Sequence, residues 1–357
     1  MGERLVFALG LCLAIIQTIV ANPVVVNNIN QLQNAKKSKH IILKNVVVPA
    51  GVSLDLTGLQ PGTVVEFDGV TKFGFTQWKG PLIKTQGSGI TIRGRNGHLI
   101  DCEGRRWWDG KGGNGGKTKP QFFHIALTDS KIEHLNVKNI PVHGFAVNGK
   151  NIYIAYVRID NHDGRTQGGH NTDGFDVANA ENVRITNCYV DNQDDCLALN
   201  SGKNILFEYN ICKGGHGISI APWGRSFDEV RDVRVIGCQV LDSRVGIRVK
   251  TGAGAHGIVK NVTYDNIVLQ NIRVSGIIVH GNYRNTGQMG KPTAGVPIED
   301  LTINNVRGNV LKDGTNIQIY VANGMARNWK WSQINVNGGT RKVECGGKPN
   351  NVHVQCG

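Results

Sequence analysis

Three aspartates and one histidine in the middle of the chain have the types and spacing that could do chemistry. The segments that hold them are NTDGFD (171–176), NQDDC (192–196) and GGHGIS (214–219). The sequence interval from Asp173 to Asp194 equals that from Asp195 to His216, and both are 21. If the chain repeats its path at that interval, we expect Asp173 to stack beside Asp194, and Asp195 beside His216.

Crowded carboxyl groups suit the hydrolysis of a glycosidic bond. That reaction needs a protonated carboxyl group to assist the leaving oxygen and an ionised one to activate water. Mutual repulsion raises the pKa of one carboxyl group while the others stay charged. An Asp-Asp pair alone is usually a solvated turn, and an acidic cluster can also hold calcium. Because all four residues recur at one interval, we favour a catalytic site that needs no metal and no cofactor.

The two adjacent aspartates impose a condition on the backbone. Neighbouring residues of a regular strand point to opposite faces. Asp194 and Asp195 can therefore both work only if they lie at a strand end or in a bend.

Two cations follow the histidine. Arg248 and Lys250 stand two residues apart in GIRVKT (246–251), so in a strand they share one face. The whole chain has 40 Lys and Arg against 27 Asp and Glu, a formal net charge of +13. Such a charge favours an anionic polymer as the partner. In a secreted protein that partner is an extracellular polymer, and we expect neither a nucleic acid nor a membrane.

Seven ten-residue blocks begin in the same way, with an apolar residue at the second position. Their first residues are Lys131, Asn151, Asn182, Asn204, Asp232, Asn261 and Asp300, at successive intervals of 20, 31, 22, 28, 29 and 39. Repeats of this length are typical of a solenoid. Since the blocks are strand-like, we expect an all-β fold: one right-handed parallel β-helix domain over residues 22–357. A β-sandwich is the second choice.

The N-terminus indicates secretion. Residues 1–21 contain one early basic residue, then an apolar stretch ending at Ala21, which is typical of a cleaved signal peptide. The stretch is short for a membrane span. One of the 8 cysteines, Cys12, lies in this segment, so seven remain and at least one must stay unpaired.

The ordered motifs NTDGFD, NQDDC, GGHGIS and Arg-x-Lys resemble the four signature motifs of the polygalacturonases, family 28 of the glycoside hydrolases. The segment RWWDGKGGNGGKTKP (106–120) resembles fungal endo-acting members. The resemblance implies a parallel β-helix of about ten coils, a monomer that cuts demethylated pectin with inversion, and polygalacturonase-inhibiting proteins as further partners.

The resemblance also implies roles for particular residues. Asp194 would be the general acid, and Asp173 and Asp195 would hold and deprotonate the attacking water. His216 would help to keep the acid protonated. Four residues would bind substrate: Arg248, Lys250, Tyr283 and Asn171. For an inverting enzyme we expect about 6.5–9.5 Å between acid and base.

Covalent features follow from the same comparison. Cys196 and Cys212 match a family disulfide, and Cys345 and Cys356 are expected to form a second one. Cys188 and Cys238 should lie two coils apart, too far to bond, as buried free thiols, and Cys102 has no evident partner. Asn261 stands in the sequence N-V-T, a glycosylation site.

The sequence departs from the family pattern at two places. Val249 replaces the usual isoleucine between the cations, and Asn282 and Arg284 flank Tyr283, where acidic residues are common. Product pattern and tolerance of methyl esters are therefore left open. The alternatives are an exo-acting enzyme, a silent pectin-binding relative, and a calcium-dependent pectate lyase on a similar solenoid.

Overall fold

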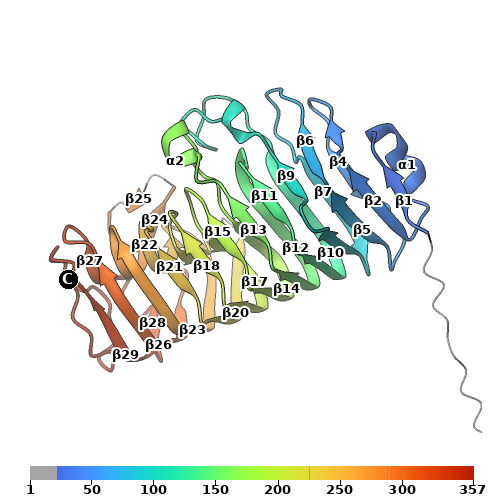
Figure 1. Cartoon of the computed structure of the whole chain (residues 1–357). Coiled ribbons are helices and arrows are strands. Elements are labelled where there is room, and N and C mark those ends of the chain that lie inside the picture. Colours follow the sequence, from blue (N-terminus) through green and yellow to red (C-terminus); the bar gives the residue numbers. More distant parts are fainter. Residues whose placement is uncertain (1–21, 225, 286, 289) are drawn as a thin grey trace, which may run out of the picture.

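The computed structural model describes residues 22–357 except positions 225, 286 and 289, and it forms a long stack of short strands (Figure 1). The predicted signal peptide, residues 1–21, lies outside the described residues. Among the residues described, 29 strands join in one sheet, and every strand pair is parallel except β24 with β25. The fold is therefore a parallel β-helix, as the block pattern predicts.

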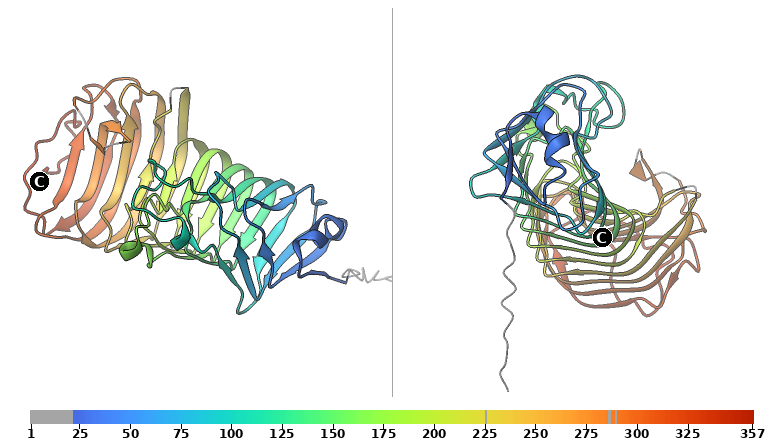
Figure 2. Two further views of the ribbon diagram at one scale, coloured as in Figure 1. Left: turned by 90° about the horizontal axis from the view of Figure 1, so that it is seen from above. Right: turned by 90° about the vertical axis from the view of Figure 1, so that its right-hand side faces the viewer.

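Each coil contributes strands to three faces, and the coils stack along one axis (Figure 2). The first face contains β4 (Leu54–Thr57), β7 (Ile83–Ser88), β10 (Gln121–Glu133), β12 (Val142–Ala155), β14 (Phe175–Thr186), β16 (Leu197–Leu199), β19 (Ile218–Ile220), β22 (Val245–Gly252), β24 (Ser275–Arg284) and β27 (Thr315–Tyr320). We call this face the floor, because the candidate site lies on it.

The other two faces close the coil. The second contains β1 (Val24–Val26), β2 (His40–Lys44), β5 (Val64–Asp68), β8 (Thr91–Gly94), the later halves of β10, β12 and β14, then β17 (Gly202–Glu208), β20 (Phe227–Ile236), β23 (His256–Ile272), β26 (Ile298–Val310), β28 (Ala326–Arg327) and β29 (Lys330–Asn337). The third contains β3 (Val47–Val48), β6 (Val70–Phe73), β9 (Leu99–Asp101), β11 (Asn136–Lys138), β13 (Arg158–Asp160), β15 (Tyr189–Asp191), β18 (Ile211–Lys213), β21 (Gln239–Leu241) and the later parts of β23, β26 and β29.

The remaining elements are short. They are the helices α1 (Leu32–Ala35) and α2 (Gly164–Gln167), the 3-10 turns Ile29–Gln31 and Gly104–Arg106, and β25 (Gly287–Gln288). α2 and β25 both stand out from the side of the stack that carries the floor (Figure 1). The loops on this side therefore border the site.

The repeated blocks begin at a left-handed residue. Asn151, Asn182, Asn204 and Asp232 all have φ between 51° and 56°, a conformation that Asn and Asp tolerate better than other residues with a side chain. Ser130 pairs with Ile152, so the first block begins at Asp129 and not at Lys131. The interval from Asp129 to Asn151 is 22, so the structural repeat at this coil is 22 residues and not the 20 counted from Lys131.

Apolar side chains fill the inside of the solenoid. Buried Val, Ile and Leu residues of all three faces form one core cluster along the stack. Phe123, Phe145 and Phe175 lie level on successive strands, with ring centroids 5.5 and 5.3 Å apart. This aromatic column supports the coils from which the floor of the site is built.

The disulfide predictions are confirmed. Cys196 bonds to Cys212, and Cys345 bonds to Cys356. The other three cysteines of the described chain are buried free thiols: Cys102, Cys188 and Cys238.

Candidate active site

Asp194 and Asp195 lie in a bend between β15 and β16, which satisfies the condition that the sequence imposed. The buried amide Nδ2 of Asn192 holds this bend by donating to the carbonyl of Asp195 at 3.0 Å and to that of Thr172 at 2.9 Å. Cys196, which forms the disulfide with Cys212, follows directly after this bend. The bend turns both carboxylates toward one cleft.

The pairing of carboxylates differs from the expectation. Phe175 pairs with Leu197, a sequence offset of 22, and the amide of Gly174 donates to the carbonyl of Asp195. Continued back, this register puts Asp173 level with Asp195, so the expected stacking of Asp173 on Asp194 is wrong by one position. In the next coil Leu197 pairs with Ile218, so the expected offset of 21 holds there. The offset differs between coils because the turns differ in length.

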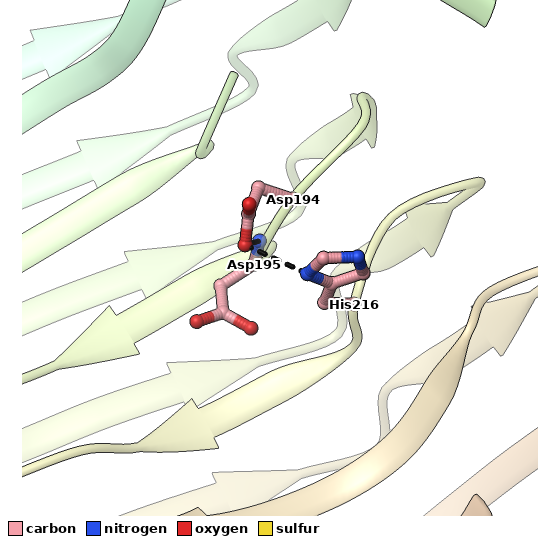
Figure 3. A group of neighbouring side chains, drawn as sticks. All are labelled: Asp194, Asp195 and His216. Atoms are coloured by element: carbon pink, nitrogen blue, oxygen red, sulfur yellow. Dashed lines mark hydrogen bonds and ion pairs between the residues drawn. The ribbon is translucent and has the colours of Figure 1, made fainter. Parts of the chain in front are cut away.

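Asp194 has two side-chain partners. Nδ1 of His216 lies 2.8 Å from its Oδ1 (Figure 3), and the side-chain amide of Asn171 donates to its Oδ2 at 2.9 Å. The histidine therefore contacts Asp194 directly, whereas the sequence placed it beside Asp195.

Asp195 has a different partner set. Lys250 donates to its Oδ2 at 2.7 Å, and the hydroxyl of Ser219 donates to its Oδ1 at 2.7 Å. Lys250 and Ser219 are largely buried, so the ion pair between Lys250 and Asp195 has little contact with water. Sequence reasoning missed Ser219, although its offset from Ala198 on the floor is one coil.

The pKa values of the cluster diverge. Burial, together with the carboxylates of Asp194, Asp176 and Asp195, raises the pKa of Asp173 well above its ordinary value. Burial and the carboxylates of Asp195 and Asp194 raise the pKa of Asp176 to about 7. Burial also acts to raise the pKa of Asp194, but His216 and Lys250 outweigh it and lower that pKa.

These directions conflict with one expected role. His216 was expected to help keep the acid protonated, yet its contact favours the ionised form of Asp194 by lowering the pKa of that carboxyl group. Asp173 and Asp176 are the carboxyl groups that burial keeps protonated. Oδ1 of Asp173 is moreover a buried atom with no hydrogen-bond partner among the described residues.

The cations and the tyrosine meet beside the carboxylates. On the floor, Asp176, Ala198, Ser219 and Arg248 lie level on successive strands. The guanidinium of Arg248 lies 5.2 Å, and Nζ of Lys250 4.7 Å, from the ring centroid of Tyr283. The buried Nε of Arg248 has no partner in the described part of the chain, which leaves a donor for a ligand.

All eight residues assigned to catalysis or substrate binding line one cleft of about 690 Å³. Its lining includes residues that the sequence did not single out: Asn114, Gln121, His143, His170, Asp176, Asn200, Trp223, Arg244, Asn285 and Arg341. Asp176 could have been found, because it stands in the motif NTDGFD on the floor strand. Most of the others belong to loops whose course the period does not predict.

The sequence profile of the glycosyl hydrolases, family 28, matches residues 38–356. This chain belongs to that family. It is 48% identical over 314 residues to the "Probable endopolygalacturonase I" of Aspergillus flavus, covering 87% of this chain and 86% of the relative. It is 47% identical over 319 residues to "Endopolygalacturonase 1" of Colletotrichum lindemuthianum, covering 88% and 87%.

Solved structures agree with the fold of the family 28 chain. Endopolygalacturonase I from Stereum purpureum, complexed with two galacturonates, superposes with a TM-score of 0.80 at 32% identity, over 88% of this chain and 95% of that one. An endo-xylogalacturonan hydrolase from Aspergillus tubingensis superposes at 0.75 with 20% identity, over 92% and 95%. The second comparison speaks for the fold alone.

The three residues at the centre of the cleft lie close together. One oxygen of Asp194, one of Asp195 and one ring nitrogen of His216 lie within 4.8 Å of one another, because both aspartates come from one bend. The separation of roughly 6.5–9.5 Å between the acid and base groups stays a prediction.

Asp194, Asp195 and His216 are close enough together to hold a metal ion, but the carboxylate oxygens of both aspartates already have partners. Lys250 and Ser219 bond Asp195, while His216 and Asn171 contact Asp194. The ammonium group of Lys250 thus supplies the cluster with the positive charge that a bound metal ion would otherwise supply. The donor set suits proton transfer better than calcium, which takes six to eight oxygen ligands.

Two further features were assigned from the sequence. Asn261 is exposed at the start of a block, and its Nδ2 donates to Asp232 at 2.7 Å. Its glycosylation stays a prediction. In the described part of the chain, no helix is long and apolar enough to cross a membrane.

Proposed function

We propose that this family 28 chain is a secreted endo-polygalacturonase that hydrolyses α-1,4-galacturonosyl linkages of pectin and polygalacturonate with inversion. The observation that carries the proposal is the cleft itself, where three carboxylates on adjoining coils lie beside Arg248 and Lys250. Carboxylates supply acid–base chemistry, and cations suit a substrate that bears a carboxylate on every sugar. The relatives named endopolygalacturonase support the same conclusion.

In the proposed reaction, Asp194 donates a proton to the glycosidic oxygen. His216 and Lys250 lower the pKa of Asp194, so that pKa must be raised when the substrate enters. An anionic polymer that displaces water raises the pKa of a carboxyl group both by its charge and by desolvation. Asp173, whose pKa is already raised, is a nearby carboxyl group that holds a proton.

Asp195 and Asp173 then act on the attacking water. Lys250 and Ser219 fix both oxygens of Asp195, so its carboxylate is oriented before substrate arrives. Positioning of this kind avoids reorganisation at the moment of reaction. Asp173 holds the water, which gives one proton to the carboxylate of Asp195. The oxygen of the water bonds to the anomeric carbon as the bond from that carbon to the glycosidic oxygen breaks.

Substrate binding falls to the cations and their neighbours. The guanidinium of Arg248 carries an unsatisfied buried donor among the described residues, and Tyr283 packs against both cations. We assign Arg248 and Lys250 to a galacturonate carboxylate beside the scissile bond. Asn171 donates to Asp194, so its position links the bound substrate to the acid.

Secretion, a monomeric state and binding of polygalacturonase-inhibiting proteins belong to the proposal. The apolar residues 1–21 and the basic net charge support an extracellular protein that acts on an anionic wall polymer. An exo-acting enzyme, a lyase or a silent pectin-binding protein remain the alternatives, and the products distinguish them.

The test is a product-size profile over time on polygalacturonate, with Asp194→Asn as the control. We expect a fast loss of viscosity, mixed oligomers, and a loss of rate of at least about 100-fold in the variant. Galacturonic acid alone from the start would mean exo action, and an unsaturated ultraviolet-absorbing product would mean a lyase. Proton NMR of the first product reports the anomer, and retention would contradict inversion.

A further inference from the structure

The cleft is divided by charge along the axis of the solenoid. Its four carboxylates all precede β19: Asp173, Asp176, Asp194 and Asp195. Its four Lys and Arg residues all follow β19: Arg244, Arg248, Lys250 and Arg341. Along the stack toward the C-terminal coils, a polymer lying in the cleft therefore passes the carboxylates first and then the cations.

Two of these arginines stand on one wall, in register with the catalytic bend. Backbone hydrogen bonds link the wall rung by rung: His216 to Asp194 (2.7 Å), Arg244 to Gly215 (2.7 Å), Val274 to Arg244 (2.8 Å), Thr315 to Val274 (2.9 Å) and Arg341 to Gly314 (3.1 Å). Arg244 is the rung after His216. Arg341 lies three rungs beyond Arg244, about 14 Å at the spacing of β-strands.

Neither side chain has a partner among the described residues. Both arginines are exposed, and no ion pair or side-chain hydrogen bond joins either one to another residue of the described chain. Some other surface arginines are paired: Arg93 and Arg184, for example, bond glutamates. Arg244 and Arg341 line the cleft with no ion-pair partner among the described residues, so their guanidinium groups are available to an anionic ligand.

We propose that Arg244 and Arg341 form a carboxylate-binding track that extends the substrate site beyond Arg248 and Lys250. The track holds free carboxylates of galacturonate units bound past the scissile bond, on the C-terminal side of the carboxylate cluster. It makes this arm of the cleft selective for de-esterified polymer. The inference rests on the proposed function and adds a specificity to it.

The opposite arm has no such requirement. Its lining before the cluster consists of neutral and imidazole groups: Asn114, Gln121, His143 and Ala146. Burial lowers the pKa of His143, so that ring favours its neutral form. A methyl ester costs little there, whereas on the arginine wall it removes the charge that a guanidinium would bind. The two arms thus differ in what they accept.

Binding measured without turnover tests this directly. In an Asp194→Asn background, the Kd of polygalacturonate oligomers is measured by calorimetry for Arg244→Gln, Arg341→Gln and the double variant, at low and high salt. We expect each substitution to raise Kd about fivefold, as a partly exposed ion pair would. The double variant should lose about 25-fold, because the two sites are well separated.

Two comparisons make the result specific. Arg307→Gln removes an exposed arginine that lies outside the cleft and bonds asparagines, so its Kd should equal that of the parent. Fully methyl-esterified oligomers carry no charge, so all the variants should bind them alike. The expected loss should also shrink at high salt.

The outcomes distinguish a failure of the arginine track from a failure of the proposed function. An unchanged Kd in the double variant of a protein that binds polygalacturonate overturns the track and leaves the proposed function standing. An equal loss for esterified and free oligomers likewise overturns it, since the effect would not depend on charge. No binding of polygalacturonate by the parent overturns both proposals.

Discussion

At the scale of single residues, the cluster is defined by where its protons lie. Three of its carboxyl groups are buried near one another, and their pKa values split according to their partners. Asp173 has an oxygen with no described partner and favours the neutral form. Asp194 has an imidazole and an amide and favours the charged form. One residue therefore stores the proton that the proposed acid must deliver.

The role of His216 can be determined from a pH profile. If its contact lowers the pKa of Asp194, His216→Asn raises that pKa, and the acid stays protonated to higher pH. We expect the alkaline limb of kcat/KM to move up by about one unit, with a lower maximum. A limb that moves down would favour the expectation from family resemblance, that the histidine keeps the acid protonated. His170→Asn, a second histidine of the cleft, is the control and should leave the limb in place.

At the scale of elements, the loop 106–120 connects the catalytic wall with the opposite one. Buried Trp107 and Trp108 anchor its root by donating to backbone carbonyls at 2.7 and 3.1 Å. At its tip, the amide of Asn114 donates to Oδ1 of Asn171 at 3.1 Å, and Asn114 accepts from Asn285 at 3.1 Å. Because Asn171 holds Asp194, the loop contacts the proposed acid through one intermediate residue.

The two contacts of Asn114 can be separated by mutation. Asn114→Ala loses both, so Asn171 is held less firmly, and we expect kcat to fall about tenfold. Asn285→Ala loses only the contact across the cleft, so kcat on short oligomers should be unchanged while polymer release quickens and fewer cuts follow each encounter. The measurements are oligomer kinetics and the ratio of reducing ends to viscosity loss. Oδ1 of Asn171 also accepts from the backbone amide of Gly113 at 3.1 Å, a contact that this variant keeps. Equal kcat in Asn114→Ala and wild type would therefore show that the side chain of Asn114 does not position Asn171.

Element geometry also marks the limit of sequence reasoning. The period of the blocks predicted stacked coils, and the adjacency of Asp194 and Asp195 predicted a bend, since no strand could aim both into one cleft. The exact partners could not be predicted, because the offset from Asp173 to Asp195 is 22, whereas the offset in the next coil is 21. Arg244 and Asn114 carry no motif, and only the paths of their backbones bring them to the cleft.

At the scale of the whole molecule, the solenoid lets charge accumulate along one groove without crossing the core. Each coil contributes a few outward side chains to the floor, while aromatic and aliphatic side chains stack behind them. Neighbouring coils are the units of stability in such a fold. The charge of a carboxyl group buried in the groove changes the free energy of unfolding of the coils that contain it. Because that charge depends on pH, the free energy of unfolding depends on pH as well.

The sign of this linkage follows from Asp176. Its pKa is about 7 in the folded chain, against 3.8 as the ordinary value. Between these values the folded state holds a proton that the unfolded state has released, so the free energy of unfolding falls as pH rises from about 4 to 7. The full effect of three units would be about 4 kcal/mol, and contact with water in the cleft reduces our expectation to about 2 kcal/mol.

Asp176→Asn should remove the part of this dependence that Asp176 contributes, while the part due to Asp173 remains. The amide is neutral at every pH and resembles the protonated acid, so the variant should gain about 2 kcal/mol over wild type at pH 7 and differ little at pH 4. Denaturant unfolding at both pH values measures it. Asp129→Asn is the matched control, since Asp129 is exposed at a left-handed position where other blocks carry asparagine. A variant that is no more stable than wild type at pH 7 would mean that Asp176 is ionised in the folded protein, and that the cleft is wetter than its burial indicates.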